Sequence, residues 1–394
     1  MDLNTFIYNV VHIIIVYFSP SIVFKMKNSI LVLFLGLISL SQAQTKNLPL
    51  FIGTYTNSCD SKGIYVYDFD TNSGELMFKN ATDKVTNPSY LSLSKDQKFV
   101  YSVNENGVES AVSSFEFDKA SGTITNLNQQ KSQGADPCYL INDDLNVIVA
   151  NYSGGNIAVF RKNADGSLTE AKQLMQHKGK GIHPRQESAH VHMVYFSPDK
   201  KYVLSTDLGT DSVDIYKYHP DAANDVLQWE SSIPVQSGSG PRHLIFSKDG
   251  KKMYVLQELN GAISVFDFVN GKLNKIQETT ILANDFKGNF TGADIHISPD
   301  GKFLYASNRG EANTISIFKI VKNGQLQPIS VVSSLGKGPR NFVIDPTGKF
   351  LLIAHQYSNE IVVFKRDLVL GVISDTGKRL ELCSPVCLVF GNQK

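Results

Sequence analysis

The segment that decides the fold is Ser239-Gly-Pro-Arg-His-Leu-Ile-Phe-Ser-Lys-Asp-Gly-Lys-Lys-Met-Tyr-Val-Leu-Gln-Glu-Leu-Asn260. It consists of two short apolar runs on either side of a Lys248-Asp249-Gly250 turn, which is the pattern of two paired antiparallel strands. Arg242 opens the first run and Glu258 follows the second. A plain hairpin brings both ends together, so the segment predicts two strands with a charged pair at one end.

Most of the remaining chain consists of looser copies of this segment. The turn recurs at intervals of about 50 residues, the length of one four-stranded propeller blade. Each turn is followed by a second and a third run rich in Val, Ile, Tyr and Phe and then by a more polar fourth run, and no amphipathic helical pattern of useful length appears after Leu48. The turn copies are Ser94-Lys-Asp, the degenerate Asp143-Asp144, Ser197-Pro-Asp, Ser247-Lys-Asp-Gly, Ser298-Pro-Asp-Gly and Asp345-Pro-Thr-Gly.

The two ends of the repeat array complement each other. The first unit, which begins at Leu50, has runs for a second, third and fourth strand but none for the innermost one. The last run, Ser384–Phe390, resembles the innermost run Asn87–Leu93 and has no partner except that gap. We therefore predict an all-β, seven-bladed β-propeller in which the C-terminal strand completes the first blade and removes its exposed edge. Truncation before Ser384 is expected to open the ring.

The N-terminal region has a different character from the repeats. Lys25-Met26-Lys27 precedes an apolar run, Ile30–Leu40, and then Ser41-Gln42-Ala43, the arrangement of a secretory signal peptide over residues 26–43. Met26 is a natural start for this segment, so residues 1–25 are predicted to be an extension upstream of the true start. The alternative is a membrane anchor formed by the apolar run Phe6–Phe18, but that run is too short to span a bilayer. We expect a single exported domain over residues 44–394, periplasmic or secreted, without a stable membrane anchor after processing.

The net charge and the cysteines indicate which partners and which disulfides to expect. The net charge of +1 argues against nucleic acid as a partner. Export permits disulfides, but the four cysteines, Cys59, Cys138, Cys383 and Cys387, have no framework spacing. Cys383 and Cys387 are too far apart along an extended strand, roughly 13 Å, to bond each other. Buried or idle thiols are the expectation.

Repeat-equivalent positions should form rings around the propeller axis, because every innermost strand faces the central channel. Both rings are expected at the same channel mouth, since a strand start lies beside the end of its antiparallel neighbour. The starts of the innermost strands give Ser89, Cys138, His192, Arg242, Ala293 and Arg340, and the ends of the second strands give Tyr55, Glu105, Tyr152, Asp207, Glu258, Arg309 and Gln356.

This concentration of charge at equivalent places has two interpretations. The residues either pair with one another as ion-pair plugs or form a site beside His190 and the Arg185-Gln186 segment, and we favour the site. Three arginines indicate an anionic ligand, because guanidinium matches carboxylate and phosphate. They also argue against a required metal: His190 and His192 could form a ligand pair, but Arg242 would crowd any cation held there.

Six segments carry a resemblance to a known family. They resemble, in order, the signature segments of the lactonase family of seven-bladed propellers, which includes propeller-type 6-phosphogluconolactonase and a fungal carboxy-muconate lactonising enzyme. The resemblance covers nearly the whole chain after Asn47. The segments are Arg185-Gln-Glu-Ser-Ala-His-Val-His192, Asp207-Leu-Gly-Thr-Asp211, Gly240-Pro-Arg-His243, Glu258-Leu, Ser307-Asn-Arg-Gly310 and Gly338-Pro-Arg-Asn-Phe342.

The resemblance implies metal-free lactone chemistry in the central channel with no cofactor and a small anionic lactone as substrate. Carried over by motif, the catalytic residues are His192, Glu258, Arg242 and Arg309, with His190 as the rival of His192. His190, Arg340, Arg185, Gln186, Asp207 and Glu105 are the expected substrate-binding residues. The signal peptide does not suit a cytoplasmic pentose-phosphate enzyme, so the family is a firmer inference than the substrate. A lactonising isomerase and a non-catalytic exported binding propeller remain alternatives.

Overall fold

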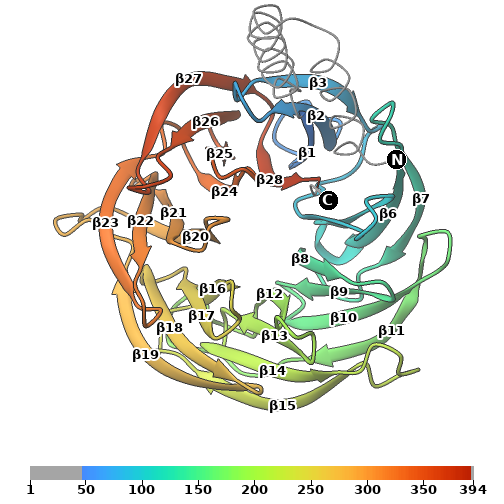
Figure 1. The fold of residues 1–394 in the computed structure, drawn as a ribbon. Coiled ribbons are helices and arrows are strands. Elements are labelled where there is room, and N and C mark those ends of the chain that lie inside the picture. The colour runs from blue at the N-terminus through green and yellow to red at the C-terminus, as the bar shows by residue number, and fades with distance from the viewer. Residues whose placement is uncertain (1–46, 392–394) are drawn as a thin grey trace, which may run out of the picture. The chain divides into compact units, whose positions relative to one another are not determined.

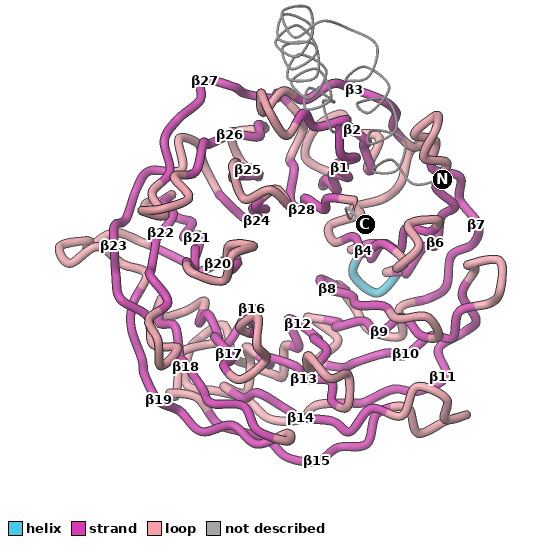
Figure 2. Tube along the Cα trace, viewed as in Figure 1, coloured by secondary structure: helices cyan, strands magenta, loops and turns pink. Residues whose placement is uncertain are grey.

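The computed structural model describes residues 47–391 as seven four-stranded antiparallel sheets arranged around a common axis (Figure 1). The seven-bladed propeller predicted from the repeats is confirmed. The short 3-10 helix η1 (Gly107–Glu109) is the helical element among these residues, and none of them forms a helix that could cross a membrane (Figure 2). The signal peptide and extension expected over residues 1–43 lie outside the described residues.

Each blade runs from an innermost to an outermost strand. The innermost strands are β28 (Pro385–Phe390), β4 (Leu91–Leu93), β8 (Pro137–Asn142), β12 (Val191–Phe196), β16 (Pro241–Phe246), β20 (Phe290–Ile297) and β24 (Pro339–Ile344). The second strands are β1 (Asn47–Thr54), β5 (Phe99–Asn104), β9 (Asn146–Asn151), β13 (Tyr202–Asp207), β17 (Lys252–Gln257), β21 (Phe303–Gly310) and β25 (Phe350–His355).

The two outer positions of each blade complete the sheets. The third strands are β2 (Ile64–Asp70), β6 (Ala111–Phe117), β10 (Asn156–Lys162), β14 (Ser212–Tyr218), β18 (Ala262–Val269), β22 (Thr314–Ile320) and β26 (Glu360–Arg366). The outermost strands are β3 (Leu76–Ala81), β7 (Ile124–Lys131), β11 (Leu168–Gln176), β15 (Leu227–Pro234), β19 (Lys272–Thr280), β23 (Leu326–Ser333) and β27 (Ile373–Glu381).

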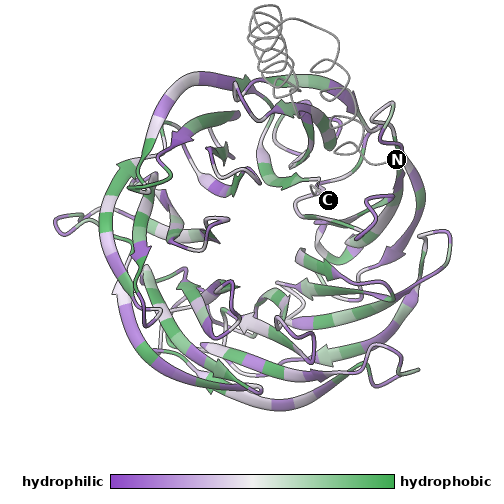
Figure 3. Ribbon diagram, viewed as in Figure 1, coloured by the Kyte–Doolittle hydropathy of each residue, from purple (hydrophilic) through white to green (hydrophobic). Residues whose placement is uncertain are grey.

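The apolar core lies between neighbouring blades. Second strands such as β9 are buried along their whole length because both faces pack against adjacent sheets, whereas the outermost strands β11 and β15 consist of half-buried and exposed residues after a buried first residue. Figure 3 shows the corresponding change from hydrophobic inner strands to mixed outer ones. One cluster runs continuously from Ile148 on β9 through Val203 on β13 to Val255 on β17. Burial of apolar side chains therefore holds neighbouring blades together.

The repeated turn has a local physical cause. The Ser247 hydroxyl donates to Asp249 Oδ1 (2.6 Å), and that carboxylate accepts from the backbone N–H of Lys251 (3.1 Å). Gly250 takes the positive φ of +71° that the turn requires. The Ser94, Ser197 and Ser298 copies form the same serine-to-aspartate hydrogen bond.

The ring closes between the two ends of the described chain. β28 pairs antiparallel with β1, from Leu50 opposite Phe390 to Gly53 opposite Cys387, so the C-terminal strand completes the first blade as predicted. Residue Leu388 also donates its backbone N–H to Asn341 Oδ1 (2.7 Å) on the preceding blade. The closing strand is thus tied both to its own sheet and to a neighbour.

The expectation of four idle thiols is wrong for two of them. Cys59 and Cys383 form a disulfide, with their Cα atoms 5.9 Å apart. Ring closure brings the loop after β1 beside the segment that precedes β28, a proximity that a sequence separation of 324 residues does not reveal. Cys138 and Cys387 are buried free thiols, as expected. A cross-link at this point reinforces the closure because it restricts the unfolded chain.

Candidate functional site

One end of the axis holds a cavity of about 300 Å³. Its wall is built from residues at the starts of innermost strands and just beyond the ends of second strands, which is where the ring argument located a site. The lining residues are Glu105, Asp136, Cys138, Tyr152, Ser153, Arg185, His192, Glu258, Arg309 and Arg340.

Glu258 is the centre of the charged cluster on this wall. Its Oε1 lies 2.7 Å from Arg185 Nη1 and 3.0 Å from Arg309 Nη2, and its Oε2 lies 3.0 Å from Arg242 Nε. The side chain is only 3% exposed, and its backbone N–H is held by Gly240 O (2.7 Å). Burial by itself raises the pKa of Glu258, but the three arginines outweigh it and lower the pKa to about 2. The carboxylate is therefore ionised at neutral pH.

Arg242 lies behind Glu258 and does not line the cavity. It is 2% exposed, and its Nη1 donates to Ala293 O and to His243 Nε2 (3.1 Å). Its Nε is close enough to Glu258 for an ion pair but lacks hydrogen-bond geometry. Burial, assisted by the nearby Arg309, lowers the pKa of Arg242 to about 10, so it keeps its charge at neutral pH. In this arrangement Arg242 supports Glu258 from the protein side.

Arg340 is the cavity arginine without a carboxylate at ion-pair distance among residues 47–391. Its guanidinium lies over the ring of Tyr55, 5.5 Å from the centroid. Burial alone lowers the pKa of Arg340, but Tyr55 and Glu105 nearby raise it above its usual range. A permanently charged group whose donors are not committed to a carboxylate can bind an anionic ligand.

His192 is the imidazole on the cavity wall. It is 5% exposed, and burial together with Arg242 and His243 holds its pKa well below the usual range, so the ring is neutral at pH 7. Cys138 Sγ contacts the His192 backbone carbonyl (3.1 Å), and the rings of Tyr152 and His192 lie at 79° to each other with 5.5 Å between centroids. The imidazole is thus neutral, and its ring contacts Cys138 and Tyr152.

The rest of the wall is acidic and hydroxylic. Glu105 accepts hydrogen bonds from Tyr55 Oη (2.9 Å) and from the Ser89 hydroxyl, and burial raises its pKa. Asp136 accepts from the Ser153 hydroxyl (2.6 Å). A ligand in the cavity would therefore meet guanidinium groups together with carboxylates and hydroxyls.

Asp136 and Ser153 are not among the site residues predicted from the sequence, because neither occupies a ring position. Asp136 directly precedes Pro137 at the start of β8, as Gly240 precedes Pro241 at the start of β16. That shared proline is the signal that could have identified Asp136. Ser153 follows Tyr152 in a turn and carries no comparable signal.

Three expected substrate-binding residues do not line the cavity: His190, Gln186 and Asp207. The ring of His190 is stacked on Tyr152 at 4.5 Å, and Gln186 Nε2 donates to Leu208 O (2.8 Å). Asp207 Oδ1 accepts from the His190 backbone N–H (2.7 Å). These residues do not form the surface of the cavity, whereas Arg185, Arg340 and Glu105 lie on it. The role of all six residues in substrate binding stays a prediction.

The displacement of Asp207 has a simple register cause. Asp207 pairs with Val191 at the start of its blade, as Gln257 pairs with Pro241 in the next one. The position equivalent to Glu258 is therefore the next residue, Leu208. Because successive strand residues point to opposite faces of the sheet, Asp207 corresponds to Gln257 and not to Glu258.

Within residues 47–391 no group of three or more His, Cys, Asp or Glu side chains is arranged to hold a metal ion. The positive charge at the cavity belongs to arginine side chains.

The match to known proteins spans the propeller. Residues 49–390 match the family model for lactonase, 7-bladed beta-propeller. The chain is 37% identical to a 6-phosphogluconolactonase of Formosa agariphila over 84% of this chain and 96% of that protein, and 34% identical to a 6-phosphogluconolactonase of Bacillus subtilis over 87% and 98%.

A solved structure agrees with these relatives. The periplasmic gluconolactonase of Pseudomonas aeruginosa is 37% identical, and the alignment covers 88% of this chain and 99% of that one with a TM-score of 0.84. The chain therefore belongs to the lactonase family of seven-bladed β-propellers, as an enzyme similar to the 6-phosphogluconolactonases.

Proposed function

We propose that this protein hydrolyses a sugar lactone that carries an anionic group, phosphate or carboxylate, in the cavity at the propeller axis. The observation that carries the proposal is the ionised Glu258 held among three arginines on a wall that also contains a neutral histidine. Family membership supports the reaction class, and the arginines support the charge of the substrate.

Hydrolysis needs a base for the attacking water and a cation for the oxyanion that forms. We assign His192 as the proton carrier, because Glu258, with a pKa of about 2, is a poor base at neutral pH. His192 takes a proton from water as the water oxygen bonds to the lactone carbonyl carbon. The ring C–O bond then breaks, and the imidazolium, made acidic by its buried and cationic surroundings, returns that proton to the ring oxygen.

The remaining cavity residues have binding roles in this proposal. Arg309 stabilises the oxyanion, and Glu258 holds Arg309 and Arg185 in place. Arg340 acts as an outer clamp for the anionic substituent. Glu105, Asp136 and Ser153 are suited to accept hydrogen bonds from sugar hydroxyls. Because arginines supply the charge that a metal would otherwise provide, the proposed reaction is metal-independent.

The test is hydrolysis of a panel of δ- and γ-lactones, with and without phosphate, by residues 44–394 in the presence of EDTA. We expect turnover of at least one anionic sugar lactone, lost in Arg309→Ala and strongly reduced in His192→Ala. Undiminished turnover by His192→Ala would remove that residue from the mechanism. If no lactone is hydrolysed but a carboxy-muconate is lactonised, the isomerase replaces the hydrolase.

We also propose that the mature protein acts in the periplasm. The charged and apolar pattern of residues 25–43 and the similarity to a periplasmic gluconolactonase support this location, and the Cys59–Cys383 disulfide fits an oxidising compartment. Expression of the full chain in a Gram-negative host, followed by fractionation and intact-mass measurement, tests the proposal. A chain beginning near Gln44 in the periplasmic fraction is expected, and an unprocessed chain in the cytoplasm would contradict it.

A further inference from the structure

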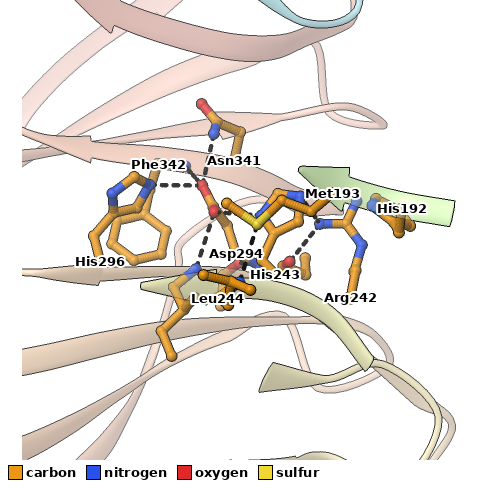
Figure 4. Close-up of polar contacts among 12 residues, drawn as sticks. His192, Met193, Arg242, His243, Leu244, Asp294, His296, Asn341 and Phe342 are labelled. Atoms are coloured by element: carbon orange, nitrogen blue, oxygen red, sulfur yellow. Dashed lines mark hydrogen bonds and ion pairs between the residues drawn. The ribbon is translucent and has the colours of Figure 1, made fainter. Parts of the chain in front are cut away.

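A second buried carboxylate lies next to the site described above. Asp294 on β20 is 3% exposed and accepts five hydrogen bonds (Figure 4). Its donors come from β16, from β20 itself and from β24, so the carboxylate joins three consecutive innermost strands. They are His243 Nδ1 (2.8 Å) and Ile295 N (2.9 Å) at Oδ1, and His296 Nε2 (2.9 Å), Asn341 Nδ2 (2.6 Å) and Phe342 N (3.2 Å) at Oδ2.

This arrangement determines which nitrogen of His243 carries the proton. An ionised carboxylate only accepts hydrogen bonds, so Nδ1 of His243 must be the protonated nitrogen. Nε2 of the neutral ring is then an acceptor, and it lies 3.1 Å from Arg242 Nη1 (Figure 4). Burial and the adjacent Arg242 lower the pKa of His243 to about 4, which agrees with a neutral ring. Both ring nitrogens therefore have defined partners.

The chain of contacts continues to the cavity. Arg242 has His243 and the Ala293 carbonyl on its Nη1 and Glu258 beside its Nε. Glu258 in turn contacts Arg309 and Arg185 on the cavity wall. Arg242 thus lies between Glu258 and Asp294 and is held by the acceptor nitrogen Nε2 of His243. Nε2 is the acceptor because Nδ1 of the same ring donates to Asp294.

We propose that Asp294 and His243 are positioning residues for the lactonase site: they hold Arg242, and through it Glu258 and its arginines, in the arrangement that binds the anionic substrate. The inference rests on the proposed function. The bonds of Asp294 to Asn341 and Phe342 serve the packing of adjacent blades and are separate from this role. His243 connects the two, because it bonds both Asp294 and Arg242.

Two substitutions of His243 separate positioning from packing. Asn can place an amide N–H near the position of Nδ1 and keep the bond to Asp294, but it offers nothing at Nε2. Gln can place an oxygen near Nε2 and keep the acceptor for Arg242, but it gives up the donor to Asp294. Each variant therefore keeps one half of the imidazole.

The experiment measures kcat, KM and thermal unfolding of His243→Asn and His243→Gln on the lactone that the wild type hydrolyses best, with a crystal structure of each variant. Positioning predicts that His243→Asn stays folded but loses kcat by roughly tenfold or more, with Arg242 displaced from Glu258. His243→Gln should keep kcat within about threefold even if its Tm falls, because the acceptor for Arg242 remains.

Full activity of His243→Asn with Arg242 unmoved would overturn the inference, and so would losses in both variants that simply follow their loss of folded protein. A wild type that turns over no lactone refutes the proposed function instead. In that case the crystal structures still decide whether His243 holds Arg242, because the displacement in His243→Asn needs no substrate.

Discussion

Glu258 and Asp294 are both buried carboxylates with 3% exposure, and both have a pKa below the ordinary value in spite of burial. Their partners differ. Glu258 is surrounded by three guanidinium groups and borders the cavity, whereas Asp294 is bound by two imidazoles, one amide and two backbone N–H groups and does not line it. The two carboxylates belong to adjoining parts of the same network.

The difference separates a packing role from a binding role. Donors from three strands bind both oxygens of Asp294 and join the strands. The arginines around Glu258 carry more N–H groups than one carboxylate can accept, and Arg309 Nε is buried without a hydrogen-bond partner. Unsatisfied donors beside a cavity are costly for stability and useful for an anionic ligand. The region around Glu258 therefore suits binding, and the region around Asp294 suits stability.

The largest effect should come from removing the packing carboxylate. Asp294→Ala leaves five donors without their acceptor and should lower the free energy of unfolding by about 4 kcal/mol, measured by urea denaturation at pH 7. The exposed Asp225 provides the control, since Asp225→Ala should change it by less than about 0.5 kcal/mol. A loss below about 1 kcal/mol for Asp294→Ala would mean that its hydrogen bonds do not hold the blades.

The binding cluster should show the opposite balance of activity and stability. Arg309→Ala should reduce kcat by roughly 10² to 10³, the usual effect of losing an oxyanion donor, while Glu258 keeps Arg185 and Arg242 as partners. Steady-state kinetics with Arg379→Ala as a control tests this, because Arg379 pairs with Asp375 on the outermost strand β27. A loss of stability comparable to that of Asp294→Ala would remove the distinction between the regions.

Acid should act on the two regions in different pH ranges. The pKa of Glu258 in the folded protein, about 2, lies below its ordinary value of 4.5. Its contribution to the free energy of unfolding is therefore fully present above pH 4.5 and is lost as the pH falls towards 2. This pKa shift corresponds to about 3 kcal/mol in the free energy of unfolding. The pKa of His243 is also lowered on folding, from 6.5 to about 4. Its contribution to the free energy of unfolding is therefore present above pH 6.5 and is lost as the pH falls towards 4.

Unfolding measured from pH 7.5 to 2.5 on the wild type, Glu258→Gln and His243→Asn separates the two ranges. The stability difference between wild type and His243→Asn should change mainly above pH 4, and that for Glu258→Gln mainly below pH 4.5. Identical pH profiles for both variants would show that the two regions titrate as one unit.

The smallest effect is expected at the exposed edge of the binding cluster. The Arg185 side chain is 43% exposed, so solvent screens its ion pair with Glu258. Arg185→Ala should raise KM about threefold to tenfold and leave kcat nearly unchanged, as steady-state kinetics would measure. A large fall in kcat instead would place Arg185 in the chemical step.

The sequence predicted the fold correctly wherever a feature recurs in every repeat. Turn spacing identified the blades, the missing innermost strand identified the closure by β28, and equivalent positions brought Glu258, Arg309 and Arg340 to one cavity. It failed at Asp207, because the inequivalence of Asp207 and Glu258 is a single-residue register difference that becomes visible only in the strand pairing.

The sequence by itself therefore determined the features that repeat: the four-stranded unit, the number of blades and the residue types near the axis. The reason is that each turn and the strands beside it are specified by residues that are close together in the sequence. The tertiary structure decided the contacts that occur once. The Cys59–Cys383 disulfide and the bonds of Asp294 to His243, Asn341 and Phe342 join residues that are far apart in the sequence. Such contacts arise only when the blades pack around a closed ring, and no local pattern encodes them.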